Sequence, residues 1–84
     1  MNPKLVEVLA ALSRIEGSDK EDAEAYIAYT AGVSRSRAST LLNSLVKLGL
    51  AEVREGRVVL TEKGKLELAR LMRLRSYFSD SPIT

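Results

Sequence analysis

The residues with the most specific chemistry lie between positions 34 and 48, where polar side chains recur at helical spacing. These polar side chains form a line along the expected helix that comprises Ser36, Thr40, Asn43 and Lys47. The residues that flank this line are Arg35, Arg37, Ser39 and Ser44. Steps of three and four residues place side chains on one face of a helix. An asparagine amide can bond adenine, an arginine guanidinium can bond guanine, and hydroxyl groups can bond bases or phosphates. This face therefore presents the groups that a DNA major groove accepts.

Catalytic chemistry finds little support in the composition. The chain of 84 residues contains no cysteine and no histidine, which removes thiolate nucleophiles, imidazole bases, disulfides and the commonest zinc ligands. No serine therefore has a histidine base, and the glycines do not form a phosphate-binding loop. We expect a protein that is not an enzyme and that needs no cofactor.

Acidic residues gather near the start of the second expected helix. Ser18 and Glu21 have the spacing of a capping box, with Ser18 as the N-cap residue and Glu21 at the third helical position. Asp19 and Asp22 lie in the same first turn, where the helix dipole favours negative charge. Metal binding is the alternative, but adjacent carboxylates on one turn of a helix point apart. We therefore expect these acids to start the helix, and we expect no metal site.

Charge is distributed unevenly along the chain. The net charge is +2, yet residues 1–33 contain three basic and six acidic side chains, whereas residues 34–84 contain ten basic and five acidic ones. The second part, with its excess of positive charge, would attract phosphates. The alternative is ordinary solvated charge on a globular surface.

Caps, glycines and apolar spacing predict the helices that position these residues. A first helix is predicted over residues 3–16, with Asn2 as its N-cap residue and Gly17 after its end. A second helix leads to a turn at Gly32, and a third, capped by Ser34, extends to about residue 48. The inner stripe of this third helix is predicted to comprise Ala38, Leu41, Leu42, Leu45, Val46 and Leu48.

A short hairpin is predicted after the third helix, with strands over residues 51–54 and 57–60. Gly56 supplies the positive φ of its turn, either in a type I turn with a bulge or in a two-residue turn with Glu55. The hairpin residues predicted to face the core are Val53, Val58 and Leu60.

The last predicted helix is capped by Thr61 and spans residues 62–79, and residues 80–84 form a frayed tail. We predict that one side of this helix packs against the domain through Leu66, Ala69 and Met72. The surface left exposed is predicted to comprise Leu68, Leu71, Leu74, Arg75 and Phe78. Because exposing such an apolar surface is unfavourable, we expect a second copy of the chain to cover it in a homodimer. The alternative is a single broad core face on a monomer.

Three spacings together characterise the chain: Ala28-x3-Gly32-Val33-x4-Ala38-x2-Leu41, Leu45-x2-Leu48-Gly49-Leu50 and Leu60-Thr61-x2-Gly64. With the hairpin, this order resembles the winged helix-turn-helix proteins over residues 3–78, in particular small MarR-type regulators and archaeal or archaeal-virus winged-helix regulators. The resemblance implies a mostly α fold with a small β-hairpin wing, in the order α-α-α-β-β-α with a long C-terminal dimerisation helix. One domain would span residues 1–79, with the helix-turn-helix over 19–48 and the wing over 51–60.

The resemblance also implies a function. Base contacts would come from Ser36, Arg37, Thr40 and Asn43, with Arg35, Ser39 and Lys47 on the same surface, and the wing contacts would come from Arg54 and Arg57. The expected partner is double-stranded DNA, bound sequence-specifically by a homodimeric, cytoplasmic transcriptional regulator. The alternatives are a winged-helix module that docks proteins and an architectural protein that binds DNA without sequence preference. No residue identifies a pocket for a small-molecule effector, and the longest apolar run, Val8 to Leu12, is too short for a membrane span.

Overall fold

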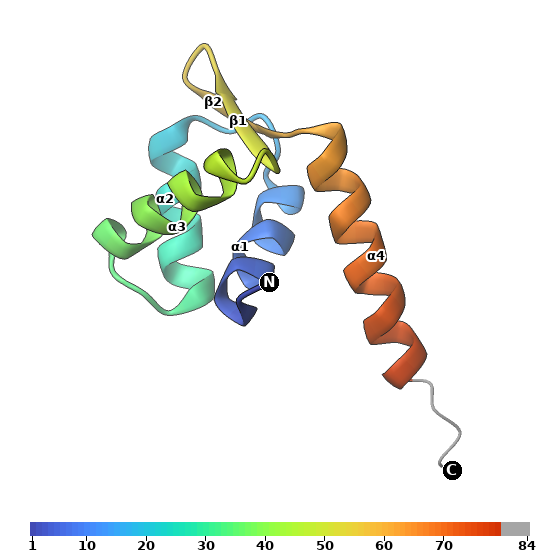
Figure 1. Ribbon diagram of the computed structural model, residues 1–84. Helices are drawn as coiled ribbons and strands as arrows, with labels where there is room; N and C mark the ends of the chain where they lie inside the picture. The colour runs from blue at the N-terminus through green and yellow to red at the C-terminus, as the bar shows by residue number, and fades with distance from the viewer. Residues whose placement is uncertain (80–84) are drawn as a thin grey trace.

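The computed structural model describes the backbone of residues 1–79 and the side chains of residues 1–74. The elements of this part of the chain are α1 (Pro3–Arg14), α2 (Lys20–Ala31), α3 (Arg35–Lys47), β1 (Ala51–Arg54), β2 (Arg57–Leu60) and α4 (Glu62–Ser79). Figure 1 shows the first three helices packed together beneath the hairpin, while α4 runs down one side and projects beyond them. The predicted order of helices and strands is confirmed, and it is the order of a winged-helix fold.

The starts of α1 and α3 carry the predicted side-chain caps. Asn2 Oδ1 accepts a hydrogen bond from the backbone N–H of Lys4 at 2.7 Å. Ser34 Oγ accepts one from the backbone N–H of Arg37 at 3.0 Å. Each bond satisfies an N–H group that has no acceptor within its own helix, so both caps help to fix where the helices begin.

The predicted capping box at the start of α2 is wrong. The N-cap residue is Asp19, whose side chain makes no capping hydrogen bond, and the helix begins at Lys20. The Ser18 hydroxyl instead donates to the carbonyl oxygen of Ile15 at 2.6 Å. Ser18 cannot act as the cap because its backbone pairs with strand β2, where the Val58 N–H donates to the Ser18 carbonyl oxygen at 2.9 Å.

This pairing attaches the hairpin to the segment between α1 and α2. β2 pairs with β1 in the antiparallel sense along one edge. Along its other edge, the Gly17 N–H donates to the Val58 carbonyl oxygen at 2.8 Å. α1 ends before Glu16, its predicted last residue, and the Glu16 carboxylate accepts a hydrogen bond from the Leu60 N–H at 3.0 Å. Both edges of β2 are therefore occupied, which holds the base of the hairpin in place.

The apolar core lies between α1, α2 and α3 and is closed by the hairpin. Its buried side chains are Val8, Leu9, Leu12, Ala23, Ile27, Ala38, Leu41, Leu42, Leu45, Leu50, Ala51, Val58 and Leu60. α1 is the central helix, since it contacts α2, α3, α4 and β2. Removing this apolar set from water is the main favourable contribution to folding, and it fixes the rotation of α3 about its axis.

Three residues predicted to face the core are exposed instead: Val46, Leu48 and Val53. Leu48 is the C-cap residue of α3, so the inner stripe of the helix ends before it. Val46 lies about 100° around the helix from buried Leu45, at the edge of the stripe. Val53 pairs with Val58 and shares its face of the hairpin, but it lies on β1, the outer strand, whereas Val58 lies on β2, which is paired along both edges.

Gly64 forms the closest approach between α4 and the rest of the domain. A Cβ atom at this position would overlap the backbone carbonyl group of Leu50. The Thr61 N–H donates to that Leu50 oxygen at 3.1 Å, and Thr61 Oγ1 caps α4 by accepting from the Gly64 N–H at 2.9 Å. Residues 64, 68 and 71 follow at steps of four and three, so this contact turns Leu68 and Leu71 toward the domain.

The predicted faces of α4 are therefore wrong. Leu68 and Leu71, which were expected to face a second copy, are partly buried and pack against the core. Leu66 and Met72, which were expected to dock on the domain, are 68% and 51% exposed. Ala69 is exposed as well. The close approach at Gly64 decides this rotation, and apolar periodicity alone does not reveal it.

The C-terminal part of α4 continues past the body. Leu74 is exposed, as predicted. The side chains of Arg75 and Phe78 and the predicted tail over residues 80–84 lie outside the described residues. Within the part of the chain that the structure describes, no helix is long and apolar enough to cross a membrane.

Gly64→Ala is expected to lower the free energy of unfolding by about 1–3 kcal/mol, the usual cost of overpacking, because the added methyl group must displace the Leu50 backbone. Urea denaturation followed by circular dichroism measures this loss. Ala69→Ser, at an exposed position of the same helix, is the control and should change stability by less than about 0.5 kcal/mol. Equal unfolding curves for Gly64→Ala and the wild type would contradict the packing of α4 described here.

Candidate nucleic-acid interface

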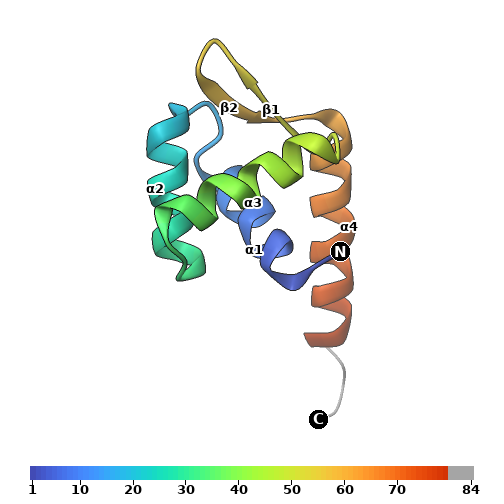
Figure 2. The same cartoon turned by 60° about the vertical axis from the view of Figure 1, so that its left-hand side comes forward.

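The polar side of α3 lies on the molecular surface. In Figure 2 the helix crosses the front of the body with the hairpin above it. The exposed residues of this side are Arg35, Ser36, Arg37, Thr40, Asn43 and Lys47, and Ser39 is half-buried. The structure therefore brings the α3 residues that were predicted from the sequence together on one surface, which is called the α3 face below.

The two arginines in the first turn of α3 differ in their surroundings. Arg35 Nη2 lies 3.9 Å from Oε1 of Glu24 and 3.4 Å from the carbonyl oxygen of Glu21, both in α2. The Glu24 side chain is only 15% exposed, so Arg35 joins the start of α3 to the neighbouring helix. Arg37 forms no ion pair within residues 1–74 and remains available to a ligand.

Hydroxyl groups in the middle of α3 bond to their own helix. Thr40 Oγ1 donates to the carbonyl oxygen of Ser36 at 3.2 Å, and Ser44 Oγ donates to that of Thr40 at 3.1 Å. The Thr40 oxygen keeps its lone pairs and can still accept a hydrogen bond from a ligand. Asn43 and Lys47 lie one turn apart on the exposed side. The middle of the α3 face therefore offers the Asn43 amide and the Thr40 oxygen, and its C-terminal end offers the Lys47 ammonium group.

The structure identifies the type of turn that joins the two strands of the hairpin. Arg54 pairs with Arg57, so the loop consists of two residues. Glu55 and Gly56 both have positive φ values, of 49° and 77°. Two successive positive φ values define a type I′ turn, which matches the twist of the strands that it joins. The sequence left this turn open between two types, and the structure has the two-residue one.

The arginines of the hairpin already have partners within the chain. Arg57 Nη1 donates to the carbonyl oxygen of Gly17 at 3.0 Å. Arg54 Nε lies 2.6 Å from Oε1 of Glu52, although its side chain is 73% exposed. The hairpin therefore presents less unbalanced positive charge than its two arginines suggest. An anion that approaches Arg54 must compete with an intramolecular carboxylate, whereas none pairs with Arg37 in the described residues.

Two further exposed residues were not singled out from the sequence. Tyr29, in the last turn of α2, is 87% exposed. Lys63 Nζ donates to the carbonyl oxygen of Leu48 at 3.0 Å and so binds the C-terminal end of α3. A signal for Tyr29 was present, because the first helix of a helix-turn-helix runs close to the DNA backbone. The contact of Lys63 with α3 could not be predicted from the sequence, because it depends on the packing of α4 beside α3.

Groups with shifted pKa values lie outside the α3 face. Hydrogen bonding from Arg14 lowers the pKa of the Tyr26 hydroxyl. Hydrogen bonding from Arg70, three residues further along α4, lowers the pKa of the Glu67 carboxyl. No group of three or more potential metal ligands occurs in the residues that the structure describes. The exposed side chains of the α3 face offer hydrogen-bonding groups and positive charge.

Comparisons with known proteins give matches among solved structures, while no protein-family model and no curated protein sequence matches the chain. The fold is similar to that of Sso10a-2, a DNA-binding protein from Sulfolobus solfataricus, with a TM-score of 0.56 and 21% identity over 93% of this chain and 83% of that one. It is also similar to PcaV, a transcriptional regulator from Streptomyces coelicolor in complex with its natural ligand, with a TM-score of 0.57 and 23% identity over 93% of this chain. The chain spans 60% of the length of PcaV. These matches show that the chain has the fold of small winged-helix proteins.

Ser34→Ala is expected to lower the free energy of unfolding by about 1 kcal/mol, because the first turn of α3 loses its side-chain cap. Thermal and urea denaturation measure the change. Ser36→Ala, in the same turn and exposed, is the matched control and should alter stability by less than about 0.5 kcal/mol. If both variants unfold like the wild type, the cap does not contribute to holding the α3 face.

Proposed function

We propose that this chain is a transcriptional regulator that binds double-stranded DNA sequence-specifically as a homodimer. The observation that carries the proposal is the α3 face: an exposed row of an arginine, a threonine, an asparagine and a lysine on a helix whose opposite side is buried in the core. The similarity in fold to one DNA-binding protein and to one transcriptional regulator supports it.

The position of each residue along α3 suggests its role. Arg37 lies in the first turn, from which recognition helices usually reach the edges of bases. Thr40 and Asn43 follow on the same side, and an asparagine amide suits the two hydrogen-bonding groups of adenine. Lys47 lies at the far end, where a point charge suits a backbone phosphate. Ser36 and Ser39 complete the contact surface beside them.

Other proposed contacts come from the edges of the α3 face. Arg35 would also contact a phosphate, because its side chain is 57% exposed and its Nη2 lies 3.9 Å from Glu24, beyond hydrogen-bond distance. Arg54 at the hairpin tip would contact the backbone, and Arg57 would support it from the base of the wing. The carboxylate of Glu55 at the tip opposes deep insertion into a minor groove, since phosphates line its edges.

The homodimer is proposed because α4 leaves apolar side chains uncovered. Leu66, Met72 and Leu74 are all exposed on this helix, and Figure 1 shows α4 projecting beyond the body. A second copy would cover this surface and place two α3 faces on successive major grooves. Leu68 and Leu71 would join the interface only at their exposed edges, next to Leu74, Arg75 and Phe78.

Salt dependence tests whether phosphates contribute to binding. If each subunit neutralises about four phosphates, the logarithm of the binding constant should fall against the logarithm of the salt concentration with a slope near −7. Fluorescence anisotropy with a labelled duplex at several salt concentrations measures this slope. A flat response, or no binding at micromolar protein, would contradict DNA binding and favour a protein-docking module.

Substitutions on the α3 face test whether binding is sequence-specific. After selection of a preferred site from random DNA, Asn43→Ala should weaken binding to that site by about 1–3 kcal/mol and relax the preference at one base pair. Lys47→Ala is the matched comparison, because losing a phosphate contact should weaken binding to all sequences equally. If no site is enriched and Asn43→Ala also acts uniformly, the protein is an architectural DNA binder.

A further inference from the structure

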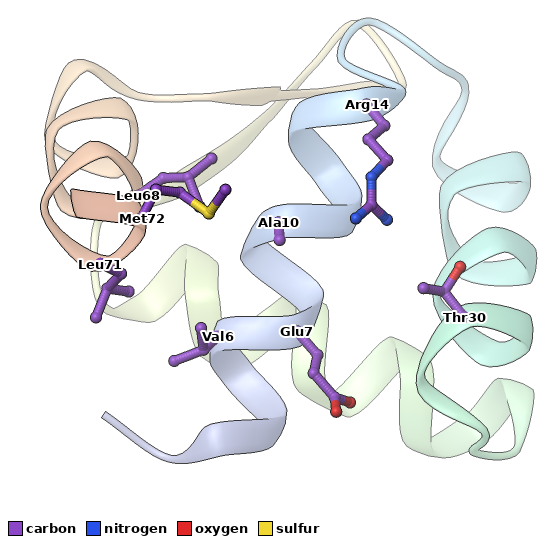
Figure 3. A pocket seen from close by; sticks show the side chains of 8 residues that line it. All are labelled: Val6, Glu7, Ala10, Arg14, Thr30, Leu68, Leu71 and Met72. Carbon is purple, nitrogen blue, oxygen red and sulfur yellow. The ribbon is translucent and has the colours of Figure 1, made fainter. Parts of the chain in front are cut away.

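A recess of about 320 Å³ lies over α1, and the proposed DNA contacts do not use it. Its lining residues are Val6, Glu7, Ala10, Arg14, Thr30, Leu68, Leu71 and Met72. In Figure 3, α1 forms the floor, Leu68 and Met72 of α4 point in from one side, and Thr30 of α2 lies on the other. The α4 side is apolar, whereas the floor carries one acidic and one basic side chain.

The charges on the floor have a regular arrangement. Glu7, Ala10 and Arg14 follow at steps of three and four residues, so they share one face of α1. Glu7 and Arg14 are separated by seven residues, which is roughly 10.5 Å along a helix axis. Ala10 lies close to the midpoint and presents only a methyl group. This face is therefore acidic toward one end, smooth in the middle and basic toward the other end.

Such a face is complementary to a copy of itself. A second α1 that runs antiparallel, about a two-fold axis near Ala10, places each Glu7 opposite the partner's Arg14. Two equivalent ion pairs then form, one on each side of the axis. The alanine methyl groups meet at the crossing, where small side chains allow two helices to approach closely. A parallel arrangement would instead place like charges opposite each other.

We propose that this face of α1 is a two-fold contact of the homodimer, with α1 docked antiparallel on the α1 of a second copy. The inference rests on the proposed function, because it specifies how the proposed homodimer forms. The two-fold axis of this contact runs across the recess, from the α4 side to the α2 side. The α4 helices of both copies therefore lie on the same side of the α1 pair. The exposed side chain of Met72 then lies beside the α4 of the partner, so one arrangement covers both the recess and part of α4.

The present contacts of the charged groups are compatible with a partner. Glu7 Oε2 lies 3.3 Å from Lys4 Nζ, and both side chains are about half exposed. Lys4 Nζ also donates to the carbonyl oxygen of Ala31 at 3.0 Å, which holds the ammonium group toward α2. The Arg14 guanidinium lies near the Tyr26 hydroxyl and lowers its pKa. Exposed pairs of this kind contribute little by themselves, whereas like charges placed opposite each other in an interface are strongly unfavourable.

Charge reversal tests the contact. In either Glu7→Arg or Arg14→Glu, position 7 of each copy carries the same charge as position 14 of the other copy. Both equivalent contacts then become repulsive, so the dissociation constant of the dimer should rise by at least about tenfold. Sedimentation equilibrium of each variant measures this constant. An equimolar mixture of the two variants pairs two basic positions with two acidic ones, so heterodimers should form with nearly the affinity of the wild type.

Controls separate this effect from a loss of folding. Glu55→Arg, at the hairpin tip, changes the net charge by the same amount as Glu7→Arg and should leave dimerisation unchanged. Circular dichroism melts show whether each variant folds, and recovery of heterodimers in the mixture requires folded chains.

The outcomes distinguish this inference from the proposed function. A wild-type dimer that neither reversal weakens, or a mixture with no preference for heterodimers, would overturn the α1 contact and leave DNA binding intact. A wild-type chain that stays monomeric up to high concentration would overturn both the contact and the homodimer. Dimerisation that responds to the reversals in a chain with no affinity for DNA would support the contact and overturn the proposed regulator.

Discussion

The α3 face is exposed because four side chains on the opposite side of the same helix, Ala38, Leu41, Leu42 and Leu45, are buried in the core. Burying a leucine side chain contributes roughly 1.5–3 kcal/mol, and a chain of this size has a narrow margin of stability. Rotating α3 by even one residue would expose part of this stripe. The packing that stabilises the domain therefore also fixes the direction of its polar residues, and any contact made by the α3 face depends on it.

The hairpin depends on a second constraint, which is the pairing of β2 along both edges. Backbone bonds from Gly17 and Ser18 hold one edge, and β1 holds the other. Arg57 adds a bond to the Gly17 carbonyl oxygen, so one of the two hairpin arginines supports the structure of the wing. Only the tip projects beyond the body, and its charge is balanced in part by Glu52. The wing is thus a small, firmly attached extension of the α3 face, and most of the unbalanced charge lies on the helix.

Gly64 links the position of α4 to the rest of the molecule. Its close approach to the Leu50 carbonyl group sets the rotation of the helix, which turns Leu68 and Leu71 inward and leaves Leu66 outward. The recess over α1 exists because α4 packs in this orientation and then continues past the body. One side of α4 therefore packs against the core, and the other side carries the exposed apolar residues on which the proposed homodimer depends.

Local chemistry in the sequence was sufficient for the order of the elements, for the caps at Asn2, Ser34 and Thr61, and for the side of α3 that faces outward. Each of these depends on neighbours within one or two turns, through helical periodicity or a hydrogen bond to the next few backbone groups. Ser18 shows where that reasoning ends, because its backbone bonds to a strand forty residues further along the chain, and no local pattern contains that partner. The faces of α4, the exposure of Val46 and Val53, and the partners of Arg35 and Arg57 were likewise decided by tertiary structure. They depend on contacts between segments distant in sequence, whose relative placement is set by packing, and periodicity within one segment does not record it.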